Sequence, residues 1–182
     1  MRVLNDIPMY PSNKRVSVKQ VNELKLDEVT PLRGGVIVYT IRSGQLLFAF
    51  GVDRNSNEWT DFGGGISYIR RGETVLSGCM REFREETLGV FGEISQKDIN
   101  SSVALYDDNM MILLLYLDVV PEIITSAFTE RCNGSLDPEV VSIVWLTQEQ
   151  LSTQINKRTS NFYERVRCFI HNATPFYDQL RC

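Results

Sequence analysis

The sequence Gly63-Gly64-Gly65, followed by Arg81-Glu82-Phe83-Arg84-Glu85-Glu86, decides the fold of this chain. Glycines allow the backbone to turn sharply and to approach another group closely, so the first stretch predicts a tight passage at the end of a strand. Residues 66–72 form a loop in this interpretation. The residues from 73 or 74 to 88 then predict a helix, and Gly89 stands in the usual position for ending one.

Three glutamates share one face of the predicted helix. Glu82, Glu85 and Glu86 stand at positions i, i+3 and i+4, within about one turn. Carboxylates in so close a cluster repel one another, and a hard cation such as Mg²⁺ or Mn²⁺ resolves the conflict because it prefers oxygen ligands. A solvated acidic face that pairs with Arg81 and Arg84 is the competing interpretation. A different side of the helix is suited to packing on a sheet and carries Leu76, Cys79, Met80, Phe83 and Thr87.

The flanking sequence predicts an α+β fold, with strands before and after this helix and two helices near the C-terminus. The expected strands lie at 15–21, 34–41, 46–50, 59–62, 103–106, 110–120 and 140–146. A turn at 42–45 makes the second and third of them a hairpin. The expected C-terminal helices run from the N-cap Thr147 to about 154, and from 161 to 172.

We expect two regions along the chain. Residues 33–182 form one domain that includes the C-terminal helix, and residues 1–32 form an N-terminal extension packed on that core. A chain of 182 residues is long enough for one domain with a sizeable core.

Composition restricts the class of protein. The net charge is −4 and the pI about 5.1, whereas a dedicated nucleic-acid module carries a basic excess. The N-terminus does not read as a secretory signal, and no apolar run approaches the ~20 residues that span a bilayer. Four cysteines without a Cys-x-x-Cys pair, and the single histidine His171, fit neither a zinc site nor a disulfide framework. We therefore expect reduced thiols and a cytoplasmic protein without membrane contact.

Glu73 and the segment 81–86 together resemble the Nudix hydrolase family. The box of that family reads G-x5-E-x7-R-E-U-x-E-E-x-G-U, where U is apolar. Glu73 stands eight positions before Arg81, and the six residues from Arg81 match R-E-U-x-E-E throughout. The ends of the box depart from the pattern, because seven residues instead of five separate Gly65 from Glu73, and two instead of one precede Gly89. The match covers some 25 residues of the chain.

The resemblance implies a Nudix-like α/β/α sandwich with a mixed central sheet, and it implies roles for residues of the box. Glu82, Glu85 and Glu86 look like catalytic ligands of Mg²⁺ or Mn²⁺, and one of them orients or deprotonates the attacking water. Glu73 looks like the structural partner of Arg81, joining the loop to the helix.

Residues outside the helix complete the expected site. The carbonyl of Gly65 is a candidate metal ligand. Glu139, just before a predicted strand, is implied as a base or an extra ligand, and a solvated turn is the alternative. Aromatic rings that stack on a base and arginines that meet phosphate oxygens are expected near the glycines and in the longer loop, with core packing and solvated loop charges as alternatives. These substrate-binding candidates are Trp59, Tyr68, Arg70 and Arg71.

Three functions are compatible with the resemblance. The first is hydrolysis of a diphosphate linkage between a nucleoside diphosphate and another moiety, by attack of water on phosphorus. The second is hydrolysis of the 5′ cap of messenger RNA, a decapping activity that predicts steeply salt-dependent RNA binding. The third is a non-catalytic domain that binds a ligand. The expected partner is a small nucleotide, RNA enters with the second function alone, and homodimers are common in the family.

A locally basic stretch near the C-terminus bears on the decapping alternative. It offers a surface for RNA, and a solvated helix face is the competing interpretation. Its residues are Lys157, Arg158, Arg165 and Arg167.

Overall fold

The computed structural model describes residues 14–173 and 176–180. The strands are β1 Ser17–Gln20, β2 Arg33–Arg42, β3 Gln45–Asp53, β4 Trp59–Thr60, β5 Phe62–Gly65, β6 Val103–Tyr106, β7 Met110–Tyr116 and β8 Val140–Thr147. The helices are α1 Val75–Glu86, α2 Gln96–Asn100, α3 Pro121–Asn133, α4 Gln148–Ile155 and α5 Glu164–Asn172. Three short 3-10 turns lie at Val21–Glu23, Leu26–Glu28 and Tyr177–Gln179.

The described strands form one mixed sheet of eight, in the order β1-β6-β7-β2-β3-β4, with β5 also paired to β2 and β8 to β3. Strand β2 lies at its centre. Its neighbour β7 runs parallel to it, while β3 and β5 pair with it antiparallel. Strand β1, which lies within the strand predicted at 15–21, pairs with β6 alone. Residues 17–20 of the proposed N-terminal extension therefore belong to the main sheet.

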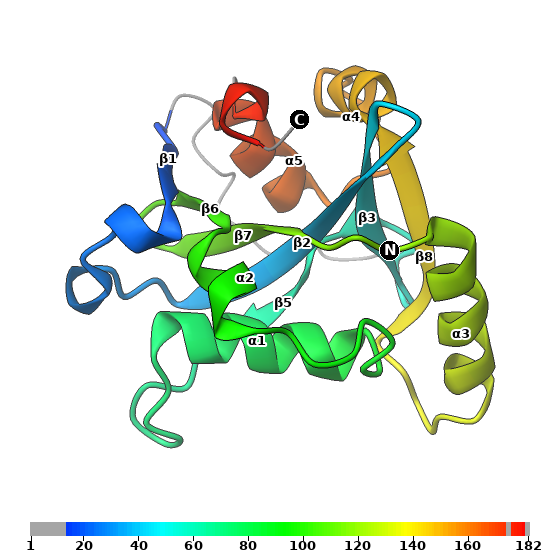
Figure 1. Ribbon diagram of the computed structural model, residues 1–182, viewed down its shortest axis with the longest axis horizontal. Coiled ribbons are helices and arrows are strands. Elements are labelled where there is room, and N and C mark those ends of the chain that lie inside the picture. Colours follow the sequence, from blue (N-terminus) through cyan, green and yellow to red (C-terminus); the bar gives the residue numbers. More distant parts are fainter. Residues whose placement is uncertain (1–13, 174–175, 181–182) are drawn as a thin grey trace, which may run out of the picture.

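Helices cover both faces of the sheet, which confirms the expected α/β/α sandwich (Figure 1). Because successive side chains of a strand point to opposite faces, β2 supplies both cores. Ile37 and Tyr39 belong to the core shared with α4 and α5. Val36 and Val38 belong to the core shared with α1 and α3.

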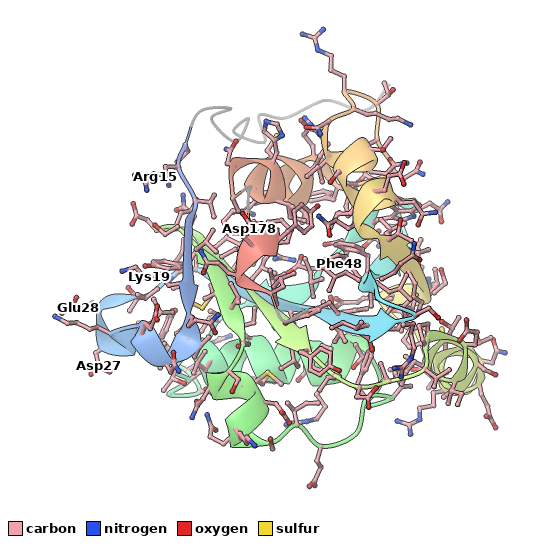
Figure 2. All side chains as sticks on the ribbon, turned by 45° about the horizontal axis from the view of Figure 1, so that its top comes forward. Arg15, Lys19, Asp27, Glu28, Phe48 and Asp178 are labelled. Carbon is pink, nitrogen blue, oxygen red and sulfur yellow. The ribbon has the colours of Figure 1, made fainter. Side chains whose placement is uncertain are left out.

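The layer with α4 and α5 extends to the C-terminal segment. Figure 2 shows Phe48 of β3 in the interior near the segment that carries Asp178, with Lys19, Asp27 and Glu28 at the periphery. The ring of Phe48 lies 6.4 Å from that of Phe176 and is fully buried. The aromatic residues around 176 therefore close this core.

The hairpin predicted around 42–45 is present. Strands β2 and β3 are joined by Ser43 and Gly44, whose φ angles are 49° and 76°. Positive φ at both central residues is the turn geometry that follows the right-handed twist of paired strands.

The segment predicted as one strand at 59–62 is two strands. Residues 59–60 pair with β3, and residues 62–65 pair with β2, so the chain changes partner at Asp61. The triple glycine is itself part of a strand rather than the turn after one. Gly63 and Gly64 lie opposite Gly35 and Gly34, and a Cβ at Gly35 would lie 2.8 Å from the Cα of Gly63. Glycine on both strands permits this close approach.

The sequence did not predict the helices α2 and α3. Strand β7 ends at Tyr116 rather than 120, and α3 starts with Pro121 at its first position. Proline suits that position because its missing N–H would have no partner within the helix. Only three residues of α3 are buried, so it shows little of the periodicity that identifies a helix: Pro121, Ile124 and Phe128.

Helix α5 begins at 164 rather than 161, because the preceding residues pair with β4. The amide of Trp59 donates to the carbonyl of Asn161, and the amide of Tyr163 donates to the carbonyl of Trp59. Helix α4 has the expected N-cap Thr147: its hydroxyl accepts from the Gln150 amide, and its own amide donates to the Gln150 side chain. Within the described residues, no helix combines the length and apolar character needed to cross a membrane.

Candidate metal centre

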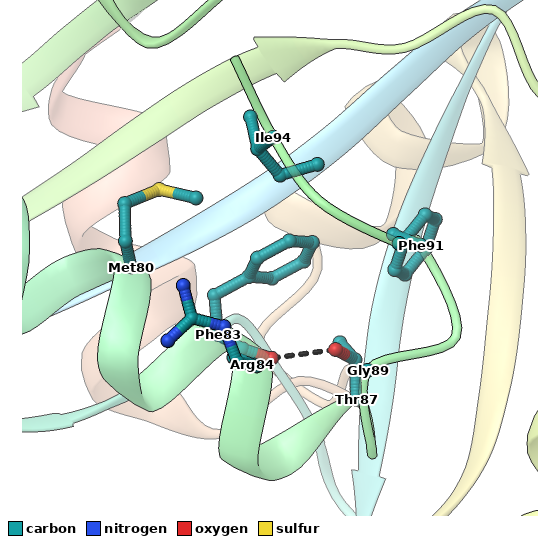
Figure 3. A pocket seen from close by; sticks show the side chains of 8 residues that line it. Met80, Phe83, Arg84, Thr87, Gly89, Phe91 and Ile94 are labelled. Atoms are coloured by element: carbon teal, nitrogen blue, oxygen red, sulfur yellow. Dashed lines mark hydrogen bonds between the residues drawn. The ribbon is translucent and has the colours of Figure 1, made fainter. Parts of the chain in front are cut away.

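Helix α1 is fixed at both ends. Thr74 caps its first turn by accepting a hydrogen bond from the Ser77 amide, in a reciprocal capping box. At the other end Leu88 and Gly89 both take positive φ angles, 53° and 67°. The hydroxyl of Thr87 donates to the carbonyl of Phe83 at 2.6 Å, as drawn in Figure 3. The buried side of the helix contains four of the five residues predicted to pack on the sheet: Cys79, Met80, Phe83 and Thr87.

Four carboxylates gather where α1 ends. A pocket of about 230 Å³ is lined by Glu82, Glu85 and Glu86. Glu139, in the segment before β8, lines the same pocket. The remaining wall is the segment before β8, residues 135–138, together with Leu88. The structure therefore brings the predicted helix glutamates together with Glu139, 53 positions further along the chain.

Arg81 engages the carboxylates on its side of the pocket. It forms an ion pair with Glu73, and its Nη1 lies 2.8 Å from Glu82 Oε1 and 3.1 Å from Glu85 Oε2. Its Nη2 donates to the carbonyl of Gly65 at 2.9 Å, the oxygen that the sequence made a candidate metal ligand. The hydrogen bonds to these acids raise the pKa of Arg81, that with Glu73 first. Arg81 thus joins the loop, the end of β5 and the acidic face of α1.

Glu73 is held from two directions. Besides Arg81, the amide of Ser67 donates to its Oε2 at 2.8 Å. The hydrogen bond from Arg81, followed by that from Ser67, holds the pKa of Glu73 below its ordinary value. The carboxylate of Glu73 therefore ties the longer loop 66–72 to the helix.

Glu86 is the last residue of α1, and its side chain is partly buried. Its Oε2 accepts a hydrogen bond from the amide of Gly63 at 2.8 Å. Burial, followed by the negative charge of Asp61, raises the pKa of Glu86 to about 9. A positive charge close to this carboxyl group would lower its pKa.

The donors in this pocket fit a hard divalent cation in their chemistry. They are carboxylate oxygens, the ligands that Mg²⁺ and Mn²⁺ prefer, and burial raises the pKa of one of them, Glu86. The side chains do not converge, however: across residues 14–173 and 176–180, no three acidic, histidine or cysteine side chains meet as a metal-binding group. Arg81 contacts two of the helix glutamates instead.

A buried ion pair that the sequence did not reveal lies next to Glu86. Arg33 donates to both oxygens of Asp61, at 2.8 and 2.7 Å, and the Asp61 side chain has no exposed surface. The signal available was the pair of glycines on each strand, which leaves room for a carboxylate between the backbones.

The substrate-binding candidates are spread over the surface. The hydroxyl of Tyr68 donates to the carbonyl of Pro31, and Arg71 Nη1 lies 4.0 Å from Glu85 Oε1. Arg70 is exposed on the same loop. Trp59 lies elsewhere: it lines a different hollow, formed with residues of α4, and its ring contacts Phe162. The structure thus places Arg71 beside Glu85 of the acidic pocket and Trp59 apart from that pocket.

The remaining predicted residues do not join this pocket. Arg167, in the basic stretch, is bound to Glu164 and to the carbonyl of Ile155, and His171 is exposed on α5. Cys79, Cys132 and Cys168 are free thiols, and Cys182 lies outside the described residues. Burial raises the pKa of the Cys79 thiol to about 12, so it has no nucleophilic character at neutral pH.

Comparison with known proteins identifies the fold. No model of a protein family matches the sequence, and no curated protein matches it. Among solved structures, a C. elegans Ap4A hydrolase in a binary complex aligns with a TM-score of 0.50 and 16% identity, over 81% of this chain and 98% of that one. The NUDIX domain of Shewanella oneidensis NrtR aligns with a TM-score of 0.38 and 14% identity, over 72% and 82%. A NUDIX family hydrolase from Clostridium perfringens gives 0.37 and 16%, over 84% and 100%.

At these identities the likeness concerns the fold alone, and the alignment with the Ap4A hydrolase carries it. This chain therefore shares the fold of that Ap4A hydrolase, a mixed sheet between two helical layers. It is the α/β/α sandwich that the resemblance of the segment 81–86 implied.

Proposed function

We propose that this chain is a metal-dependent hydrolase that cleaves a diphosphate linkage in a nucleoside diphosphate joined to another moiety, by attack of water on phosphorus. The observation that carries the proposal is the acidic pocket, where Glu82, Glu85 and Glu86 at the end of α1 lie opposite Glu139. The likeness in fold to a protein named as an Ap4A hydrolase supports it.

Glu82, Glu85 and Glu86 are the residues that would hold Mg²⁺ or Mn²⁺. When bound, such an ion lowers the pKa of a water molecule and neutralises charge on phosphate oxygens. The buried position of Glu86 favours this role, because a cation removes the cost of keeping its carboxylate charged. Arg81 contacts both Glu82 and Glu85, so it fixes the positions of their carboxylates before a cation binds.

The chain's own groups supply the remaining parts of the reaction. The oxygen of water forms a bond to one phosphorus, the bridging P–O bond breaks, and the proton that water loses passes to a carboxylate of the pocket. We assign that proton to Glu139, which faces the helix glutamates and is exposed to water. Arg70 and Arg71, exposed on the loop 66–72, would bind phosphate oxygens of the substrate.

A substrate panel tests the proposal. The purified protein is incubated with Mg²⁺ or Mn²⁺ and nucleotide sugars, dinucleoside polyphosphates, ADP-ribose, nucleoside triphosphates or capped RNA. We expect metal-dependent cleavage of a nucleotide-linked diphosphate at a rate that depends weakly on salt. Release of the cap with a steep salt dependence would assign the decapping activity instead. No cleavage of any substrate would leave a ligand-binding domain and overturn the proposal.

Substitution of the helix glutamates locates the reaction. The double variant Glu85→Gln/Glu86→Gln keeps the size and hydrogen-bonding capacity of both side chains but removes their charges. We expect it to fold like the wild type and to lose orders of magnitude in turnover, because the ligands for the cation are gone. Wild-type turnover of this variant in Mg²⁺ would show that the reaction takes place elsewhere.

A further inference from the structure

We propose that Arg33 and Asp61 are positioning residues for Glu86: their ion pair fixes the Gly63 amide that binds the Glu86 carboxylate and keeps Arg33 from pairing with that carboxylate itself. The inference rests on the proposed function. It concerns a pair that belongs to β2 and to the junction of β4 and β5, outside the helix that carries the acidic face.

The geometry of the pair is that of a fixed fork. Arg33 Nη1 donates to Asp61 Oδ2 at 2.8 Å, and Nη2 donates to Oδ1 at 2.7 Å. The sulfur of Met110 lies 3.4 Å from Nη1, and the hydroxyl of Thr60 donates to Oδ1 at 3.1 Å. Two parallel N–H···O bonds define both the distance and the orientation of the two groups. The carboxylate of Asp61 is therefore held in one position relative to β2.

The two strands are built around the Asp61 carboxylate. A Cβ added at Gly35 would lie 2.0 Å from Asp61 Oδ2, and one added at Gly63 would lie 2.7 Å from the same oxygen. Glycine weakens a strand interior, so its presence on both sides marks a close approach that the fold requires. The position of Gly63 is therefore set by contact with Asp61.

Gly63 connects the pair to the acidic pocket. One side of this residue packs on Asp61, while its amide donates to Glu86 Oε2 at 2.8 Å. A shift of the Asp61 carboxylate would move the strand against which it packs, and with it the only hydrogen-bond donor shown for Glu86 among the described residues.

Charge supplies the second part of the role. The Asp61 carboxylate accepts hydrogen bonds from both Nη groups of Arg33, and the Asp61 side chain has no exposed surface. Without Asp61, the guanidinium of Arg33 would lack a partner in a buried place and would draw the Glu86 carboxylate toward it. Without Arg33, two carboxylates would oppose each other beneath the pocket. Stability alone explains the pair poorly, because a buried ion pair adds little over apolar residues of similar volume.

The test uses the full chain with Asp61→Asn, Arg33→Met and the double variant Arg33→Met/Asp61→Asn. Mn²⁺ binding is measured without substrate by electron paramagnetic resonance, and kcat and KM are measured separately. Hydrogen exchange of the Gly63 amide reports on the metal-free protein. We expect each variant to bind Mn²⁺ roughly 10–100-fold more weakly and to lose kcat with little change in KM. We also expect faster exchange at Gly63.

The double variant and two further variants, Arg42→Met and Arg33→Lys, separate positioning from folding. The double variant removes both members of the ion pair and leaves neither as a lone buried charge. We therefore expect it to stay folded even if a single variant unfolds. Arg42→Met is the matched control, because Arg42 pairs with the exposed Asp118 at the other end of β2, and it should leave Mn²⁺ binding and kcat unchanged. Arg33→Lys keeps the charge without the fork and should recover part of the loss.

Two results overturn the inference, and they are distinguishable. If the wild type binds no Mn²⁺ and cleaves nothing, the proposed function fails and the inference fails with it. If the wild type is active but the folded double variant matches it in Mn²⁺ affinity, kcat and exchange at Gly63, the pair merely joins two strands.

Discussion

At the scale of single residues, the acidic pocket contains carboxyl groups in unlike environments. Glu86 is held by a backbone amide in a buried place, whereas Glu85 is exposed and shares Arg81 with Glu82. Glu73, on the far side of Arg81, has a pKa below its ordinary value. One arginine therefore connects a structural carboxylate to the carboxylates that we assign to the cation.

The lowered pKa of Glu73 predicts a pH-dependent contribution to stability. A carboxyl group with a lowered folded-state pKa stabilises the protein above its unfolded value, 4.5, and the contribution disappears as pH falls through the folded value. We expect wild type to be more stable than Glu73→Gln at pH 7, with the difference shrinking as pH falls below 4.5. Urea unfolding of both proteins between pH 7 and pH 3.5 measures this. A difference that stays constant over that range would contradict the assignment.

At the scale of secondary structure elements, the pairing of β2 with β5 determines where the pocket lies. The two strands approach closely because glycines face each other, Gly34 opposite Gly64 and Gly35 opposite Gly63. Side chains from neighbouring elements fill the space that the absent Cβ atoms leave: Asp61 lies at Gly35, Cys79 at Gly34 and Glu82 at Gly64. The packing of α1 on this part of the sheet thus depends on glycine.

The close approach predicts unequal effects of alanine at two glycines. Gly35→Ala places a Cβ 2.0 Å from Asp61 Oδ2, so we expect a loss of about 1–3 kcal/mol in unfolding free energy. Gly65→Ala, in the strand opposite, meets no atom within 4 Å and should change stability by less than about 0.5 kcal/mol. Urea midpoints at constant m-value measure both. Equal losses at the two positions would show that the strand pairing differs from the one described.

At the scale of the whole molecule, the acidic pocket joins segments that are far apart in the chain. Helix α1 supplies three glutamates, and the segment before β8 supplies Glu139. Strand β8 reaches this position because it pairs with β3, and β3 pairs with β2, on which α1 packs. The sheet therefore determines the width of the pocket.

Cation binding to this pocket predicts a change in the stability of the whole protein. A ligand at 100 times its Kd stabilises the folded state by about 2.7 kcal/mol, which for a chain of this size raises Tm by roughly 5–11 °C. We expect Mn²⁺ to raise the Tm of the wild type and EDTA to reverse the rise. Glu85→Gln/Glu86→Gln should show little response. The same response from that variant would place the bound cation outside the pocket.

The sequence by itself determined the parts of this protein that depend on near neighbours. The spacing of Glu82, Glu85 and Glu86 defines a helix face because a helix repeats every 3.6 residues. The sequence likewise predicted the hairpin turn at Ser43 and Gly44 and the N-cap Thr147, because turns and caps depend on local interactions.

Only the tertiary structure decided which distant groups meet. The partner of Asp61 is Arg33, 28 positions away, and the sequence offered no period or spacing that would join them. The change of strand partner at Asp61 and the place of Glu139 beside α1 have the same origin. Each depends on which strands pair across the sheet, and that choice reflects the burial of whole faces rather than any local preference. The local sequence therefore determined which carboxylates the helix presents to the pocket. The packing of the sheet determined the depth of the pocket, its charge balance and its outer wall.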